Sequence, residues 1–167
     1  GNVGDAEISG IESLININVS NILNISNLHN INLFINNSIL ISEYVTSKEN
    51  GILSNEVEFV PKINLKSGLN YNYNKLSLKF QYSYLSSQYT DATNSVESDL
   101  SGLIGLIPSY SILDISASYS YNNIILEAGC NNILDKYYFT TRATGYPGPG
   151  IIPSINRNFY VTLEFKL

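Results

Sequence analysis

The chain has 167 residues, a formal net charge of −5 and only 14% charged residues, whereas charged residues make up about 25% of an average soluble domain. The acidic balance excludes a nucleic-acid-binding surface, which requires clustered Lys and Arg. Cys130 is the single cysteine of the sequence, and this excludes an intrachain disulfide and a cysteine-based metal cluster.

The first part of the chain carries apolar residues at every second position. Ile31, Leu33 and Ile35 alternate with Asn and other residues, and Phe34 and Leu40 are the exceptions to the pattern. A period of two places one face of a strand in an apolar medium and the other face in water. We predict the first two strands at residues 7–20 and 28–45.

The same period continues through the middle of the chain. Leu76, Leu78 and Phe80 alternate with Ser and Lys, and from Leu113 onward the odd positions are apolar or aromatic whereas the even positions are Asp or Ser. A helical spacing is not sustained in these segments. We predict three further strands at residues 58–73, 75–89 and 110–121.

The end of the chain shows the clearest alternation. Phe159, Val161 and Leu163 share one predicted face, and Tyr160 and Thr162 lie on the other. We predict the last strands at residues 124–134 and 157–167, which gives about seven antiparallel strands in an all-β chain.

The predicted connections alternate between short and long. The short ones are residues 21–27, the turn near Asn74 and the turn at Asn122–Asn123, and the long ones are residues 46–57, 90–109 and 135–156. Short turns at one end and long loops at the other are typical of an up-and-down transmembrane β-barrel. Tyrosines near the predicted strand ends are consistent with aromatic girdles at the two membrane interfaces.

Seven strands do not make a complete barrel of this kind. Bacterial single-chain barrels have an even number of strands, eight or more. An open sheet in lipid would leave unpaired edges, at a cost of several kcal/mol for each unsatisfied backbone group. We therefore expect residues 1–167 to be the carboxy-terminal part of a larger barrel.

Two segments near the end of the chain resemble a known family. The segment Asn131-Asn132-Ile133-Leu134-Asp135-Lys136-Tyr137-Tyr138 is similar to the "N-N-L-F-D-K-x-Y" segment of TonB-dependent receptors. The segment from Arg157 to Leu167 resembles the closing strand of that family, with Asn156 where Gly is common and Leu167 where a terminal aromatic is usual. The intervening loop, Thr141 to Pro153, is similar to the last extracellular loop of ferric citrate receptors.

The resemblance implies an outer-membrane receptor of a Gram-negative bacterium. Such receptors are barrels of about 22 strands with a plugged lumen. The family imports a ferric complex, here ferric citrate or another iron–siderophore complex, with energy from the inner-membrane TonB complex acting through the plug. The expected partners are outer-membrane lipid, TonB and the iron complex. The iron complex is the transported ligand, and a covalently bound cofactor is not expected.

The candidate ligand-binding residues lie in or beside the last long loop. Arg142 and Arg157 carry planar guanidinium groups that suit the carboxylates of a ferric citrate complex. Tyr146 and Asn156 add possible hydrogen bonds. The competing interpretation is that Arg157 pairs within the barrel wall and that Arg142 is solvated.

Other residues give no convincing catalytic or metal site, and we do not expect an enzyme. The lone histidine, His29, is interpreted as structural, and Asp91, Glu97 and Asp99 as residues that keep their loop solvated. Three alternatives stay open: a receptor for another ligand such as a sugar or cobalamin, a passive porin-like barrel, and a soluble β-sandwich acting as a binding module, because period two alone does not exclude a packed core.

Overall fold

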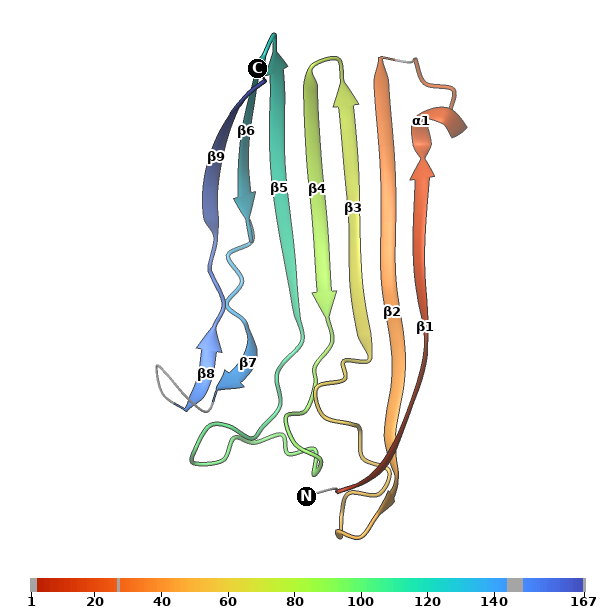
Figure 1. Cartoon of the computed structure of the whole chain (residues 1–167), viewed down its shortest axis with the longest axis vertical. Helices are drawn as coiled ribbons and strands as arrows, with labels where there is room; N and C mark the ends of the chain where they lie inside the picture. The colour runs from red at the N-terminus through yellow and green to blue at the C-terminus, as the bar shows by residue number, and fades with distance from the viewer. Residues whose placement is uncertain (1–2, 27, 144–148, 167) are drawn as a thin grey trace.

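A computed structural model describes residues 3–26, 28–143 and 149–166 of the chain. Within these residues, seven strands form one antiparallel sheet, and each strand pairs with its neighbour in the order β1-β2-β3-β4-β5-β6-β9 (Figure 1). The strands are β1 (Gly4–Asn18), β2 (His29–Ser47), β3 (Ile63–Tyr73), β4 (Leu76–Leu85), β5 (Tyr110–Tyr121), β6 (Ile124–Asn131) and β9 (Asn158–Phe165). The sheet is an open, up-and-down part of a barrel, and the predicted number of sheet strands is confirmed.

The connections separate by length, as the sequence predicts. The β1–β2, β3–β4 and β5–β6 connections lie at one end of the sheet, and the long loops lie at the other (Figure 1). The short helix α1 (Val19–Ile22) lies in the β1–β2 connection. The Asn18 side chain caps it by accepting a hydrogen bond from the Asn21 amide at 2.8 Å. Asn74 and Asn122 adopt positive φ angles of 53° and 49° in the other two turns, a conformation that Asn tolerates better than most residues.

Several predicted strand ends were wrong by a few residues. The strand predicted from residue 58 begins at Ile63, because Phe59 has a φ of 59° and Pro61 has no amide to donate to a ladder. The strand predicted to residue 89 ends at Leu85, after which Gln88 pairs instead with Ile107 inside the following loop. The strand predicted to residue 134 ends at Asn131.

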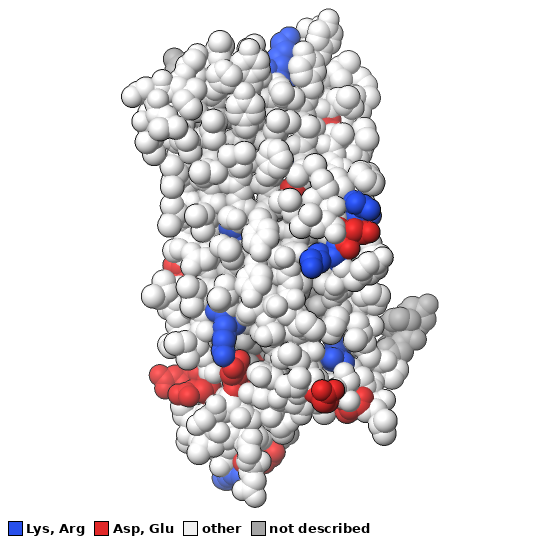
Figure 2. All heavy atoms as spheres, turned by 180° about the vertical axis from the view of Figure 1, so that it is seen from behind, with Lys and Arg blue, Asp and Glu red and all other residues white. Residues whose placement is uncertain are grey.

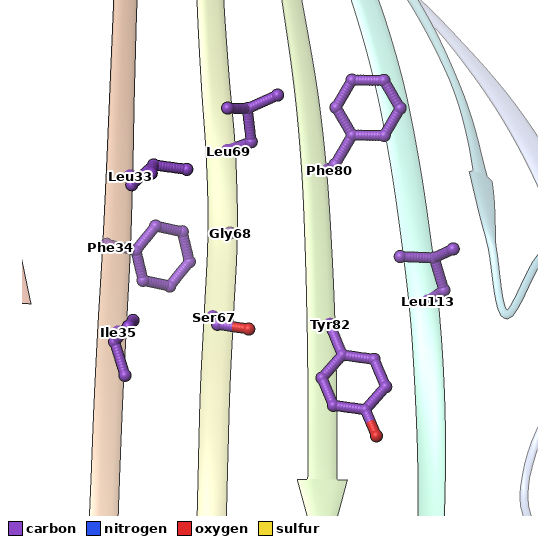
Figure 3. Close-up of a pocket in the computed structure, with 9 residues that line it drawn as sticks. All are labelled: Leu33, Phe34, Ile35, Ser67, Gly68, Leu69, Phe80, Tyr82 and Leu113. Atoms are coloured by element: carbon purple, nitrogen blue, oxygen red, sulfur yellow. The ribbon is translucent and has the colours of Figure 1, made fainter. Parts of the chain in front are cut away.

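The register of the strands joins the apolar positions into continuous rows. One row crosses all seven strands, because each of its members is paired directly with the next. This row consists of Ile17, Leu33, Leu69, Phe80, Ile115, Cys130 and Phe159. Figure 3 shows its central members, Leu33, Leu69 and Phe80, around a shallow hollow of the sheet. This face of the sheet is therefore mainly apolar, with Ser67 among its polar exceptions.

Aromatic residues gather on the apolar face near the short turns. His29, Tyr73 and Tyr119 belong to one cross-strand row. The His29 ring stacks on the Tyr73 ring with centroids 4.7 Å apart, and its Nδ1 lies 2.8 Å from the hydroxyl of Tyr71. These contacts agree with the structural interpretation of His29.

The opposite face is mainly polar, and two of its aromatic residues lie over glycines. Phe34, one of the two exceptions in the second predicted strand, is paired with Gly68, and Tyr160 is paired with Gly129. A Cβ at Gly68 would lie 2.3 Å from the Phe34 ring, and one at Gly129 would lie 2.4 Å from the Tyr160 ring. Figure 3 shows the Phe34 ring extending from β2 toward Gly68. The missing side chains leave the space in which these rings lie.

A second, smaller sheet was not predicted. Strands β7 (Phe139–Ala143) and β8 (Gly150–Pro153) form a two-stranded antiparallel hairpin within the last long connection. The predicted loop at residues 135–156 is therefore partly ordered as strand. In the described part of the chain, none of the helices is long and apolar enough to cross a membrane.

Candidate functional site

The candidate site is the layer of three long connections at one end of the sheet (Figure 1). We call them loop A (residues 48–62, between β2 and β3), loop B (residues 86–109, between β4 and β5) and loop C (residues 132–157, between β6 and β9 and including β7 and β8). Figure 2 shows that acidic and basic side chains gather mainly toward this end of the molecule. The layer thus combines charge with the most irregular backbone of the chain.

Loops A and B are joined by hydrogen bonds from Asn94, Asn55 and Phe59. The Asn94 side chain donates to the Glu56 carbonyl and accepts from the Glu56 amide, both at 2.8 Å. The side-chain amide therefore pairs with Glu56 as a neighbouring strand would. Asn55 donates to the Ala92 carbonyl at 2.9 Å, and the Phe59 amide donates to the Tyr89 carbonyl at 2.9 Å.

Two aspartates, Asp91 and Asp99, hold turns of loop B by accepting hydrogen bonds from nearby residues of the same loop. Asp91 accepts hydrogen bonds from the Thr93 and Ser95 amides at 3.0 and 3.3 Å. The Ser101 hydroxyl, assisted by backbone amides including that of Ile104, lowers the pKa of the Asp99 carboxyl. A turn held by a carboxylate with a lowered pKa is most stable above the pKa of the free carboxyl and loosens as the pH falls through the lowered value. These two acids shape the loop in addition to solvating it.

Loop C is joined to loop B through Arg142. Its Nη1 donates to the Gly102 carbonyl at 2.9 Å and its Nη2 to the Leu106 carbonyl at 3.2 Å. The guanidinium also lies 5.3 Å from the centre of the Phe139 ring, within the range of a cation–π interaction. The Arg142 side chain therefore points into the loop layer and is not simply solvated.

The segment that carries the family resemblance has a structural role. Asn132 is 3% exposed, and its side chain bonds both the amide and the carbonyl of Lys136 at 2.9 Å. Asp135 accepts from the Arg157 amide at 3.0 Å and pairs with the Arg157 guanidinium at 3.5 Å. These contacts end β6 and lead the chain into β9.

The structure places the four predicted ligand-binding residues in different surroundings. Arg142 is part of the contact between loops B and C, whereas Arg157 pairs with Asp135 at the start of β9. Asn156 is exposed, and its carbonyl accepts from the Asn158 side chain at 3.2 Å. Tyr146 lies outside the described residues. Ligand contact by all four residues stays a prediction.

Sequence reasoning missed Asn94 as an organising residue of the site. A lone Asn in a polar loop has no distinctive sequence pattern, and its positive φ of 54° is known only from the structure. Among residues 3–26, 28–143 and 149–166, no group of three or more His, Cys, Asp or Glu side chains is arranged to hold a metal ion.

The family described as "TonB dependent receptor-like, beta-barrel" matches residues 1–133. The chain belongs to this family. The matched region covers most of the chain and lies mainly before the segments that carried the sequence resemblance. A search of the curated proteins found no match. Barrels of this family are outer-membrane proteins of Gram-negative bacteria, and the family and fold are those of transporters and receptors.

Solved structures of receptors share the fold. The ferric citrate transporter FecA in the unliganded form has a TM-score of 0.84 and 21% identity, with 96% of this chain and 24% of that chain covered. The ferric yersiniabactin uptake receptor FyuA from Yersinia pestis has a TM-score of 0.73 and 18% identity over 98% of this chain and 24% of that chain. The siderophore receptor PiuA from Acinetobacter baumannii has a TM-score of 0.72 and 24% identity over 98% of this chain and 22% of that chain.

The chain spans about a quarter of the length of these TonB-dependent receptors. At such identities the likeness shows the fold alone. A copper transporter, OprC, shares it as well, with a TM-score of 0.70 and 18% identity over 99% of this chain and 24% of that chain. These likenesses therefore do not identify a ligand for this chain.

Proposed function

We propose that this chain forms the carboxy-terminal wall and three outer loops of an outer-membrane receptor that imports a ferric complex. Ferric citrate is the favoured ligand, and the energy is supplied by TonB acting through a plug domain that lies outside the present sequence. The observation that carries the proposal is the apolar row across all seven strands, combined with a folded loop layer at one end of the sheet.

The apolar face has the dimensions of a membrane surface. The apolar-face positions of β3 run from Ile63 to Tyr73. Ten steps along a strand cover about 33 Å, which corresponds to about 25 Å of membrane thickness at a tilt of 35–45°. Large residues on this face are unusually exposed for a soluble protein, as with Ile41 at 68% and Val161 at 72%. Lipid is the partner that this face fits.

The aromatic residues near the short turns support a position of these turns at a membrane interface. Tyr73, Tyr119 and Tyr121 lie at the edge of the apolar face, and the Lys75 ammonium is 5.4 Å from the centre of the Tyr121 ring. Tyrosine rings prefer the boundary between hydrocarbon and water, and a lysine can extend its ammonium into the headgroup layer. The short turns would then face the periplasm and the loop layer the outside of the cell.

The arginines of loop C support an anionic ligand. A ferric citrate complex is rich in carboxylates, and Arg binds such groups through two parallel hydrogen bonds. Arg142 and Arg157 now donate to carbonyls or to Asp135. Binding would therefore exchange these acceptors for ligand carboxylates. Tyr146 and Asn156 are the further candidates for hydrogen bonds to the ligand.

Ligand binding by the purified full-length receptor tests this proposal. We expect saturable binding of iron-55 citrate, weakened about tenfold or more by Arg142→Ala or Arg157→Ala, because a hydrogen bond to a charged group contributes about 1.5–3 kcal/mol. Lys166→Ala, at the opposite end of the sheet, is the control and should bind normally.

Binding of other ligands to the purified receptor would change or overturn this proposal. Saturable binding of a catecholate iron complex without binding of ferric citrate would keep the iron receptor and change its ligand. Binding of cobalamin, a sugar or copper alone would overturn the iron assignment. Unchanged affinity in both arginine variants would overturn their role as ligand contacts.

A further inference from the structure

Loop B is the centre of the loop layer, because both of its neighbours are bonded to it. Asn94 joins it to loop A, and Arg142 joins it to loop C. Loops A and C are separated by some seventy residues of sequence, and loop B connects them. Among the described residues, loop B thus provides a hydrogen-bonded route from the hairpin β7–β8 to loop A.

The backbone of loop B is shaped to receive Arg142. Gly105 has a φ of 131°, and a Cβ at this position would lie 3.2 Å from the Arg142 Nη2. A Cβ at Gly102 would lie 3.1 Å from the Cα of Gly150. Glycines at these two positions let the loop B backbone approach both the guanidinium and strand β8.

The Arg142 guanidinium is held by loop B through two of its nitrogens. Two of its nitrogens donate to carbonyls that lie four residues apart in loop B, and its Nε is buried without a hydrogen-bond partner. A planar fork holds two separate acceptors at once, whereas the ammonium of a lysine is a single point charge. Removing the fork would leave the Gly102 and Leu106 carbonyls without this donor.

We propose that Arg142 is a latch that binds loops A, B and C into one mechanical unit, so that a movement of the hairpin β7–β8 is transmitted to loop A. This inference rests on contacts within the loop layer and does not depend on which ligand is transported. It assigns Arg142 a conformational role in the ligand-free receptor, in which its two donors hold carbonyls of loop B.

Amide hydrogen exchange of the ligand-free full-length receptor in detergent tests the latch. In Arg142→Gln we expect amides of loop B, such as Gln88, Gly105 and Ile107, to exchange about tenfold faster, because the loss of hydrogen bonds to a charged donor lowers the local opening free energy. Amides of loop A should also exchange faster, and amides of strands β3 and β4 should not change.

Three variants sharpen the test. Arg142→Lys should give an intermediate effect, because it keeps the charge and one donor position. Arg157→Gln is the matched control, because Arg157 bonds within its own loop, to Ile133 and Asp135, and it should leave loops A and B unchanged. Asn94→Ala removes two of the hydrogen bonds between loops A and B and should loosen loop A without Arg142 being altered.

The exchange pattern decides between two results. Faster exchange in loops A and B with Arg142→Gln, absent with Arg157→Gln, supports the latch. Exchange that changes only in the hairpin β7–β8, or in loop B without loop A, overturns the transmission of movement. If Arg142→Gln does not fold, the same criteria apply to Arg142→Lys. A failure to bind ferric citrate would leave this result untouched, since no ligand is present in the measurement.

Discussion

Replacing Phe80 with Arg is expected to lower the free energy of unfolding of the full-length receptor in a phospholipid bilayer by about 2–4 kcal/mol. Phe80 lies near the middle of the apolar row that crosses all seven strands. A cation there would sit in hydrocarbon, where the cost is greatest at the centre of the membrane and falls toward the interfaces. The midpoint of guanidinium unfolding in lipid vesicles measures the change.

The adjacent residue supplies the control for this prediction. Gln81 is paired with Gly68 and Asp114 on the polar face. Gln81→Arg introduces the same cation one position further along the strand, toward water and beside a carboxylate. We expect little loss of stability from it. Equal losses from Phe80→Arg and Gln81→Arg would mean that the two faces have been assigned wrongly.

Replacing Gly129 with Val is expected to destabilise the receptor by about 1–3 kcal/mol, the usual cost of overpacking. A Cβ at this position would lie 2.4–2.5 Å from two ring carbons and the hydroxyl oxygen of Tyr160. The ring would have to move, and its hydrogen bond to Glu127, now 3.0 Å long, would be strained or lost. The measurement is again the unfolding midpoint in lipid vesicles.

The sign of this effect should reverse when the ring is removed. In a Tyr160→Ala background the three atoms nearest to the Cβ at position 129 are removed, and a valine is a better strand residue than glycine by roughly 0.5–1 kcal/mol. Gly129→Val should then stabilise the protein relative to Tyr160→Ala alone. If Gly129→Val is equally harmful in both backgrounds, the ring does not occupy the space that the glycine leaves.

The sheet could be predicted because the features that determine it are visible within short stretches of the sequence. An apolar residue at every second position fixes the face of each strand, as with Val161 and Leu163, and the lengths of the connections fix which ends meet. Phe34 was an exception under that rule. Its partner, Gly68, is thirty-four residues away, and only the strand register brings the two together.

The loop layer could not be predicted to the same depth. Arg142 was predicted as a candidate for ligand contact, whereas its described partners are backbone carbonyls of Gly102 and Leu106. Every residue has a carbonyl, so the sequence carries no sign of such an acceptor. The hairpin β7–β8 was missed for a related reason, because the Gly- and Pro-rich segment between its strands reads as a turn.

The family resemblance was found in residues that hold the chain together. Asn132 forms the bend after β6, and Asp135 holds Arg157 at the start of β9. These contacts are required by the wall of the barrel whatever the ligand is. They carry little information about ligand specificity.

The most direct measurement is an immunoblot of outer-membrane fractions with an antibody raised against residues 142–157, using source cells grown with and without iron. We expect a band several times larger than the 18.5 kDa of this chain, present in the outer membrane and stronger after iron starvation. A band near 18.5 kDa, or one confined to the soluble fraction, would contradict the assignment of this chain to an iron-complex receptor.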